Sequence, residues 1–212
     1  MTRRLLLSTN NHDKVREFQE ILAGLPLEIV TPASLGLEME VPETGSTFAE
    51  NAAIKARAFH DATGLLSLSD DSGLEVDALN GAPGVYSACY SGLPNGAEKN
   101  RYVLRQLEGV PWEGRGCRYV CEIAMVDEAG RLYRCRGVMK GKIALEPKGE
   151  GGFGFDPIFH VPRYRRTVAQ MPPELKNRIS HRGRAGQRAR AALERLVATD
   201  PGWLPGAPAS QS

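Results

Sequence analysis

Alternating apolar and polar stretches divide the first half of the chain into predicted strands and helices. Residues 5–9 form an apolar run typical of a buried parallel strand, and a polar turn and a helix with one apolar face follow it. A second strand is predicted at 27–31. Thr47 and Glu50 have the spacing of a capping box, which predicts a helix over about 48–62. The first strand, turn and helix have the layout of a phosphate-binding element, because a helix N-terminus offers N–H groups and a positive dipole end.

The second half of the chain is predicted to contain a helix, a β-hairpin and a C-terminal helix. The helix is expected at 95–108, and strands at 117–126 and 131–139 flank a polar turn. An Ala- and Arg-rich helix follows residue 183. Residues 199–212 are rich in Pro, Gly, Ala and Ser, which predicts a disordered tail.

Composition excludes several classes of protein. The 212 residues are 42% hydrophobic and 25% charged, as in ordinary globular proteins, and no apolar run is long enough for a membrane span. The N-terminal apolar stretch is too short for a signal peptide, so a cytoplasmic protein is expected. The four cysteines form no Cys-x-x-Cys pair and have no nearby His, which argues against a zinc site or a disulfide framework.

Charge is distributed unevenly, although the net charge is only +2. Residues 163–195 contain ten Lys and Arg against two Glu, a net +8, so the remainder of the chain carries −6. This distribution fits a protein that binds a polyphosphate, with the metal ion near acidic residues and the phosphates near the basic C-terminal segment. It also fits a surface that binds nucleic acid, and both interpretations stay open here.

The sequence Asp70-Asp71-Ser72-Gly73 follows a short apolar run and is expected at the end of a buried strand. Two adjacent carboxylates repel each other, so something should hold them ionised. A hard divalent cation with oxygen ligands does this economically, and Mg²⁺ is the usual one where phosphates are handled. The structural alternative is a turn that caps the strand, since Asp and Ser hydrogen-bond their own backbone and Gly closes turns.

Polar residues near the two N-terminal helices are candidate phosphate and metal contacts. Thr9, Asn11 and Lys14 follow the first strand, where they could reach phosphate oxygens. Glu43 lies just ahead of the capping-box helix, and Lys55 lies two turns into it. The structural alternatives are a surface loop for Glu43 and a solvated helix lysine for Lys55.

A glycine-rich segment at 149–154 allows close backbone approach, and aromatic residues follow it. Phe155 is the predicted stacking partner for a purine, a contact that contributes about 1–3 kcal/mol. Phe153 and Phe159 are expected to fill the core.

Lys176, His181 and Arg182 gather near the start of the last helix. Donors at a helix N-terminus make a receptor for carbonyl or phosphate oxygens. An ordinary polar helix start is the alternative.

Six stretches resemble, in order, the motifs of the RdgB/inosine triphosphate pyrophosphatase family; they are residues 8–14, 43–52, 70–74, 81–88, 151–159 and 179–183. That family hydrolyses ITP, dITP and XTP to the monophosphate and pyrophosphate. The resemblance implies an α/β fold in which a long twisted mixed β-sheet is flanked by helices and two lobes enclose a central cleft. It also implies one two-lobed domain over 1–198, Mg²⁺ and a homodimer.

Matched residue by residue, the resemblance implies that Asp71 is the catalytic proton acceptor and that Glu43, Asp71 and Asp70 lie at the metal. The other matched residues would bind the substrate; they are Thr9, Asn10, Asn11, His12, Asp13, Lys14, Lys55, Ser72, Phe153, Gly154, Phe155, Asp156, Lys176, His181 and Arg182. The chain departs from the family pattern at Asn10 and Asp13, where Gly is usual, and at Cys89, where bacterial members commonly carry Arg.

The predicted function is therefore a Mg²⁺-dependent pyrophosphatase that keeps aberrant purine nucleotides out of DNA and RNA. A Maf-like pyrophosphatase with another base preference is one alternative, and the Phe-Gly-Phe-Asp and Ser-His-Arg-Gly stretches argue against it. A basic nucleic-acid-binding protein is the other; it would not need the three carboxylates and would bind in a steeply salt-dependent way. No membrane association and no stable nucleic-acid partner are expected.

Overall fold

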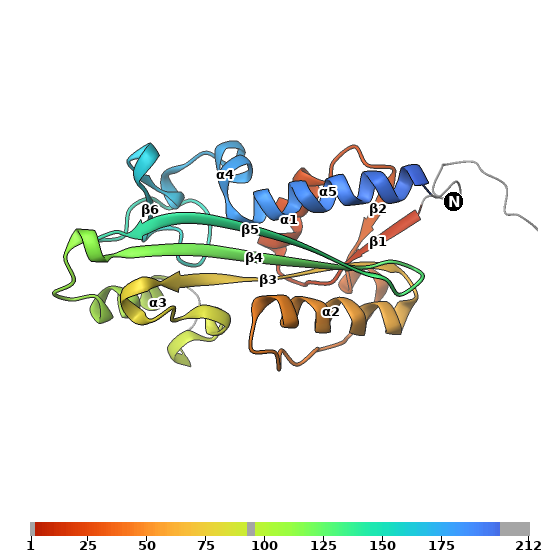
Figure 1. The fold of residues 1–212 in the computed structure, drawn as a ribbon, viewed down its shortest axis with the longest axis horizontal. Helices are drawn as coiled ribbons and strands as arrows, with labels where there is room; N and C mark the ends of the chain where they lie inside the picture. Colours follow the sequence, from red (N-terminus) through yellow and green to blue (C-terminus); the bar gives the residue numbers. More distant parts are fainter. Residues whose placement is uncertain (1–2, 93–95, 200–212) are drawn as a thin grey trace, which may run out of the picture. The chain divides into compact units, whose positions relative to one another are not determined.

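The strands form one mixed sheet in the computed structural model, which describes residues 3–92 and 96–199 (Figure 1). Within these residues the sheet has seven strands in the order β2-β1-β3-β4-β5-β6-β7. β1 is parallel to β2 and β3, and β6 is antiparallel to β5 and β7. The strands are β1 (Arg3–Leu7), β2 (Leu27–Val30), β3 (Leu66–Val76), β4 (Gly116–Val126), β5 (Leu132–Ile143), β6 (Phe159–Val161) and β7 (Arg166–Thr167).

The helices flank this sheet, and the predicted α/β fold is confirmed. They are α1 (His12–Ile21), α2 (Phe48–Thr63), α3 (Ala97–Gln106), α4 (Pro173–Ile179) and α5 (His181–Thr199). The predicted hairpin corresponds to β4 and β5, which are neighbours in the sheet. Apart from Thr199, the tail predicted at 199–212 lies outside the described residues. None of the helices in residues 3–92 and 96–199 has both the length and the apolarity needed to cross a membrane.

The chain divides into two compact units. The first comprises Met1–Asp71, Glu122–Arg136 and Ala185–Ser212, and the second comprises Ser72–Cys121 and Gly137–Arg184, with the undescribed residues excepted in both.

Small residues bring the helices of the first unit close to their neighbours. Three alanines of α2, including Ala52 and Ala56, pack against Ala124 and Val126 of β4. α1 and α5 lie side by side, and Arg190 of α5 donates a hydrogen bond to the main-chain oxygen of Ile21 at 3.1 Å (Figure 1).

The ends of α2 confirm the capping prediction. The Thr47 hydroxyl accepts from the N–H of Glu50 at 3.2 Å, and the Glu50 carboxylate accepts from the N–H of Thr47 at 3.2 Å. At the other end Gly64 adopts a left-handed conformation with φ of 67°, which a glycine takes without steric cost. The position of α2 matters because this helix carries Lys55.

The prediction that a strand ends before Asp70 is wrong, because β3 continues through Asp71 to Val76. Successive side chains of a strand point to opposite faces, so the two carboxylates are separated rather than crowded. Each then has its own neighbour, Lys14 of α1 for Asp70 and Asn51 of α2 for Asp71. The strand therefore tolerates two adjacent acidic residues.

A buried guanidinium organises the second unit. Arg115, which is 4% exposed, donates to the main-chain oxygens of Leu107, Val110, Ile143 and Ala144 at 2.9–3.3 Å. It thus fastens the segment after α3 to the end of β5.

We expect Arg115→Met to lower the free energy of unfolding by about 3 kcal/mol, because it leaves several buried carbonyl groups without a donor. Denaturant titration would measure this loss. Arg101→Met, at an exposed position of α3, is the matched control and should leave the unfolding midpoint unchanged. Equal midpoints for the two variants would show that the four hydrogen bonds contribute little.

Candidate active site

Carboxylates and lysines gather in the first unit and form what we call the carboxylate group: Lys14, Glu43, Lys55, Asp70 and Asp71. The ammonium nitrogen of Lys14 lies 3.1 Å from Asp70 Oδ2. Lys55 Nζ donates to Glu43 Oε1 at 2.7 Å and to the main-chain oxygen of Asp70 at 2.9 Å. The structure thus brings together the five charged residues that sequence reasoning assigned to phosphate and metal.

The start of α1 places Lys14 in this group. Asn11 is the N-cap residue, and its Oδ1 accepts from the N–H groups of Asp13 and Lys14 at 3.0 and 3.2 Å. Its own N–H donates to Thr9 Oγ1 at 3.2 Å, while His12 is exposed. The side-chain oxygen of Asn11 is therefore used for capping, and main-chain N–H groups of the first turn are the donors that a phosphate would meet here.

Asn10 and Asp13 are two further residues predicted to contact the substrate around α1. Asn10 is exposed, and the carboxylate of Asp13 forms an ion pair with Arg16 at 3.0 Å. Their predicted contact with substrate stays a prediction.

Asn51 links the loop before α2 to Asp71, and sequence reasoning gave it no role. Its Nδ2 donates to Asp71 Oδ2 at 3.1 Å, and its Oδ1 accepts from the N–H of Gly45 at 2.8 Å. A Cβ on Gly45 would lie 2.6 Å from Glu50 Cβ, so only glycine fits this approach. One buried amide therefore orients Asp71 and the loop that carries Glu43. Sequence reasoning could have found Asn51, because it lies within the stretch 43–52 that matches the family.

The positive charge near Asp71 does not fully compensate the effects of burial and of Glu43 on its carboxylate. Burial raises the pKa of Asp71 and Glu43 adds to the effect, while Lys55, Asn51 and Lys14 offset it only in part. Burial alone would lower the pKa of Lys55, but the carboxylates of Asp70, Asp71 and Glu43 outweigh it and raise that pKa. Lys55 therefore stays protonated.

The donor set fits Mg²⁺ without forming a complete cage. Among the described residues, no three His, Cys, Asp or Glu side chains lie close enough together to hold a metal ion. Mg²⁺ is usually held by one or two carboxylates, with phosphate oxygens and waters supplying the remaining ligands. Glu43 and Asp71, which are close enough for Glu43 to raise the pKa of Asp71, are the residues that could supply those carboxylates.

A second set of residues lies in the second unit and forms what we call the aromatic–cation group: Ser72, Tyr119, Phe153, Asp156, Lys176, His181 and Arg182. Lys176 Nζ and Arg182 Cζ lie 4.5 and 5.5 Å from the centre of the half-buried Phe153 ring. Arg182 Nη2 also donates to Ser72 Oγ at 2.8 Å. Cationic side chains over an aromatic ring place their N–H donors beside a flat apolar surface.

Asp156 ties this group together. Its Oδ2 accepts from Lys176 Nζ at 2.9 Å and from the N–H of Phe153 at 3.0 Å, and its Oδ1 accepts from the Tyr119 hydroxyl at 3.2 Å. The Tyr119 ring stacks on that of His181, with centroids 4.5 Å apart. Burial raises the pKa of Tyr119, and the Asp156 carboxylate adds to this effect, so its hydroxyl stays a donor. Tyr119 was not predicted, because nothing in its strand pattern separates it from a core residue.

The assignment of the aromatic residues must be corrected. Phe155 is 5% exposed and belongs to the core, whereas Phe153 is the half-buried ring beside the cations. Gly152 and Gly154 have φ of 72° and 62°, which curls this segment into a turn and exchanges the expected orientations of the two rings. Phe159 is fully buried, as predicted.

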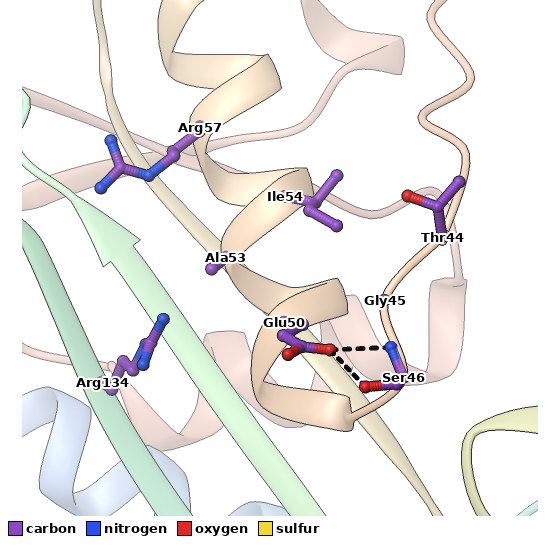
Figure 2. Close-up of a pocket in the computed structure, with 8 residues that line it drawn as sticks. All are labelled: Thr44, Gly45, Ser46, Glu50, Ala53, Ile54, Arg57 and Arg134. Carbon is purple, nitrogen blue, oxygen red and sulfur yellow. Dashed lines mark hydrogen bonds between the residues drawn. The ribbon is translucent and has the colours of Figure 1, made fainter.

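Two surface pockets, one in each unit, have no predicted site residue in their lining. The pocket in the first unit, about 500 Å³, lies against α2 between Thr44, Ser46, Glu50, Arg57 and Arg134 (Figure 2). Figure 2 shows Glu50 turned toward Ser46, whose N–H donates to its carboxylate at 2.7 Å. The pocket in the second unit, about 220 Å³, is lined by Trp112 and His160 among others. The chemistry of the site rests on the two groups described above.

Comparison with known proteins covers nearly the whole chain. The model of the Ham1 family matches residues 5–192. The dITP/XTP pyrophosphatase of Symbiobacterium thermophilum is 50% identical over 200 residues, 92% of this chain and 96% of that protein. The dITP/XTP pyrophosphatase of Desulforamulus reducens is 48% identical over 194 residues, 91% and 96% of the two chains. A solved HAM1 protein from Coxiella burnetii has a TM-score of 0.82 at 41% identity and covers 91% of this chain and 99% of its own.

Proposed function

Because this chain belongs to the Ham1 family, we propose that it hydrolyses the noncanonical purine nucleotides dITP, ITP and XTP to the monophosphate and pyrophosphate. The reaction cleaves a phosphoanhydride bond and removes these nucleotides from the supply used for DNA and RNA. The observation that carries the proposal is the Phe153 ring with Lys176 and Arg182 beside it, because it supplies both a stacking surface and donors for a purine.

The carboxylate group would bind the phosphate chain. The side chains of Lys14 and Lys55 can pair with phosphate oxygens and with the pyrophosphate that leaves. Glu43 and Asp71 would hold Mg²⁺, which when bound neutralises phosphate charge and activates water. Asp71 would also accept the proton of the attacking water.

The aromatic–cation group would read the base. Hypoxanthine and xanthine carry a carbonyl at C6, which Lys176 or Arg182 can satisfy, whereas adenine presents an amine there. Buried donors left without an acceptor strongly disfavour the wrong base. Asp71 of one group and Ser72 of the other are consecutive residues of β3.

The basic C-terminal segment offers little support for the nucleic-acid alternative. Arg184 and Arg190 of α5 donate to main-chain oxygens of Val138 and Ile21, and Arg188 donates to that of Arg136. These guanidinium groups hold neighbouring segments of the protein, whereas nucleic-acid binding needs them directed at phosphates.

A pyrophosphate-release assay with Mg²⁺ tests the function. We expect ITP, dITP and XTP to be hydrolysed at least about 100-fold more efficiently than ATP, because adenine presents an amine where these bases present a carbonyl to Lys176 or Arg182. EDTA should abolish the activity, and re-addition of Mg²⁺ should restore it. Equal rates on all purine triphosphates would contradict the base assignment, and release of single phosphates would show that a different bond is cleaved.

We also propose that the enzyme is a homodimer and works in the cytoplasm, where its substrates form. Light scattering should give twice the chain mass of 23.1 kDa. A monomer mass at micromolar concentration would contradict the dimer.

A further inference from the structure

Lys99 is a buried lysine in the second unit that the proposed mechanism does not use. It lies in α3 and is 1% exposed. Its ammonium group donates to the main-chain oxygens of Ser87 and Ala88 at 3.1 and 2.6 Å. It also lies 6.0 Å from the centre of the Phe155 ring. Burial of an ammonium group is costly, and hydrogen bonds such as those to the two carbonyl groups offset that cost.

The turn that Lys99 holds is packed tightly against β3. Ser87 Oγ accepts from the N–H of Leu74 at 2.9 Å and donates to the main-chain oxygen of Gly84 at 2.7 Å. A Cβ on Gly73 would lie 2.3 Å from Ser87 Oγ and 2.7 Å from that oxygen of Gly84. The position of this turn therefore sets the position of the strand at Gly73 and Leu74.

The residue immediately before Gly73 belongs to the aromatic–cation group. Ser72 Oγ accepts the hydrogen bond of Arg182, whose guanidinium lies beside the Phe153 ring. The Lys99 ammonium also lies near the ring of Phe155. The next residue, Asp156, accepts hydrogen bonds from Lys176 and from the N–H of Phe153. Lys99 thus holds the turn at 84–88 by hydrogen bonds and lies near the segment that carries Phe155.

We propose that Lys99 is a positioning residue for purine binding, which acts through the turn at 84–88 and Ser72 to place Arg182. This inference rests on the proposed function. It assigns to Lys99 an effect on recognition of the base and little on the phosphate contacts, because Asp71 is held separately by Asn51 and the main-chain oxygen of Asp70 by Lys55.

Inhibition by the two products separates these effects. In Lys99→Met, we expect the inhibition constant of IMP and the KM of ITP to rise about 10-fold, since a small displacement of binding groups weakens binding to that extent. The inhibition constant of pyrophosphate and kcat should stay within about twofold of wild type, a difference of under 0.5 kcal/mol. Lys140→Met, at an exposed position of β5, is the matched control and should change none of these constants.

A purely structural role would lower the melting temperature and the active fraction, and would leave both inhibition constants unchanged. That result would overturn the proposal, as would a parallel rise in both constants. If Lys99→Met does not fold, Ser87→Ala removes the bond to Leu74 while it leaves the lysine and both carbonyl groups in place, and should weaken IMP and not pyrophosphate. A wild-type enzyme inactive on ITP would refute the proposed function instead, so the two failures are distinguishable.

Discussion

Asp71→Asn should reduce pyrophosphate release from ITP by about 10³-fold or more, since it removes both a proton acceptor and a metal-binding carboxylate. The amide has nearly the same shape, and its oxygen can still accept the hydrogen bond from Asn51 that Asp71 Oδ2 accepts at 3.1 Å. The loss should therefore appear in kcat at saturating Mg²⁺ and ITP, with the fold intact by circular dichroism.

The melting temperature of Asp71→Asn should not fall, although its activity does. Burial and Glu43 raise the pKa of Asp71 in the folded protein. A carboxyl group with a raised folded pKa favours folding at low pH, and this contribution is lost as the pH rises through the folded pKa. At neutral pH the ionised group opposes folding, so Asp71→Asn should melt at the same temperature or higher.

Asp61→Asn is the matched control for this experiment, because Asp61 is an exposed residue of α2 in the same unit. It should keep both the wild-type rate and the wild-type melting temperature. A near wild-type rate for Asp71→Asn would remove Asp71 from the chemistry. A melting temperature many degrees lower would instead show that its charge supports the fold.

Phe153→Ala and Phe155→Ala should fail in different ways, although the two residues are separated only by Gly154. Phe153→Ala should lower kcat/KM for ITP about 10- to 100-fold through loss of base stacking, with little change in stability. Phe155→Ala should lower the free energy of unfolding by about 3–5 kcal/mol, because it empties a core position that is 5% exposed.

Kinetics with ITP and denaturant titrations of both variants would check this contrast, and each variant is the control for the other. If Phe155→Ala lost activity at full stability while Phe153→Ala lost stability, the original sequence-based assignment would be right and the orientation of the two rings wrong. Equal losses of activity and of stability in both variants would show that the two rings pack together and do not have separate roles.

Local signals explain which parts of the fold were predictable. The capping pair of Thr47 and Glu50 and the glycine at 64 act within one helix, and α2 begins and ends where they indicate. The hairpin of β4 and β5 was predictable because its turn residues lie between two regular apolar stretches. Lys14, Asp70 and Asp71 were candidates from their local sequence, whereas the roles of Glu43 and Lys55 came from the resemblance, since their contacts join segments distant in the sequence.

Long-range contacts explain what was missed. Nothing local indicates that β3 continues through Asp70 and Asp71, because the partners that make this possible belong to α1 and α2. The role of Asn51 depends on its position opposite Asp71. The exchange of Phe153 and Phe155 follows from backbone angles at two glycines, which a residue pattern does not specify.

The arginines of α5 fasten their neighbours through peptide oxygens, as Arg190 does with those of Ile21 and Ala23. Every amino acid carries such an oxygen, proline included, so evolutionary drift at residues 21 and 23 leaves this attachment intact. Because the acceptors are neutral oxygens, raising the ionic strength should loosen these hydrogen bonds less than it loosens an exposed ion pair. This attachment therefore constrains the arginines and not the side chains of the residues that receive them, and only core packing restricts Ile21.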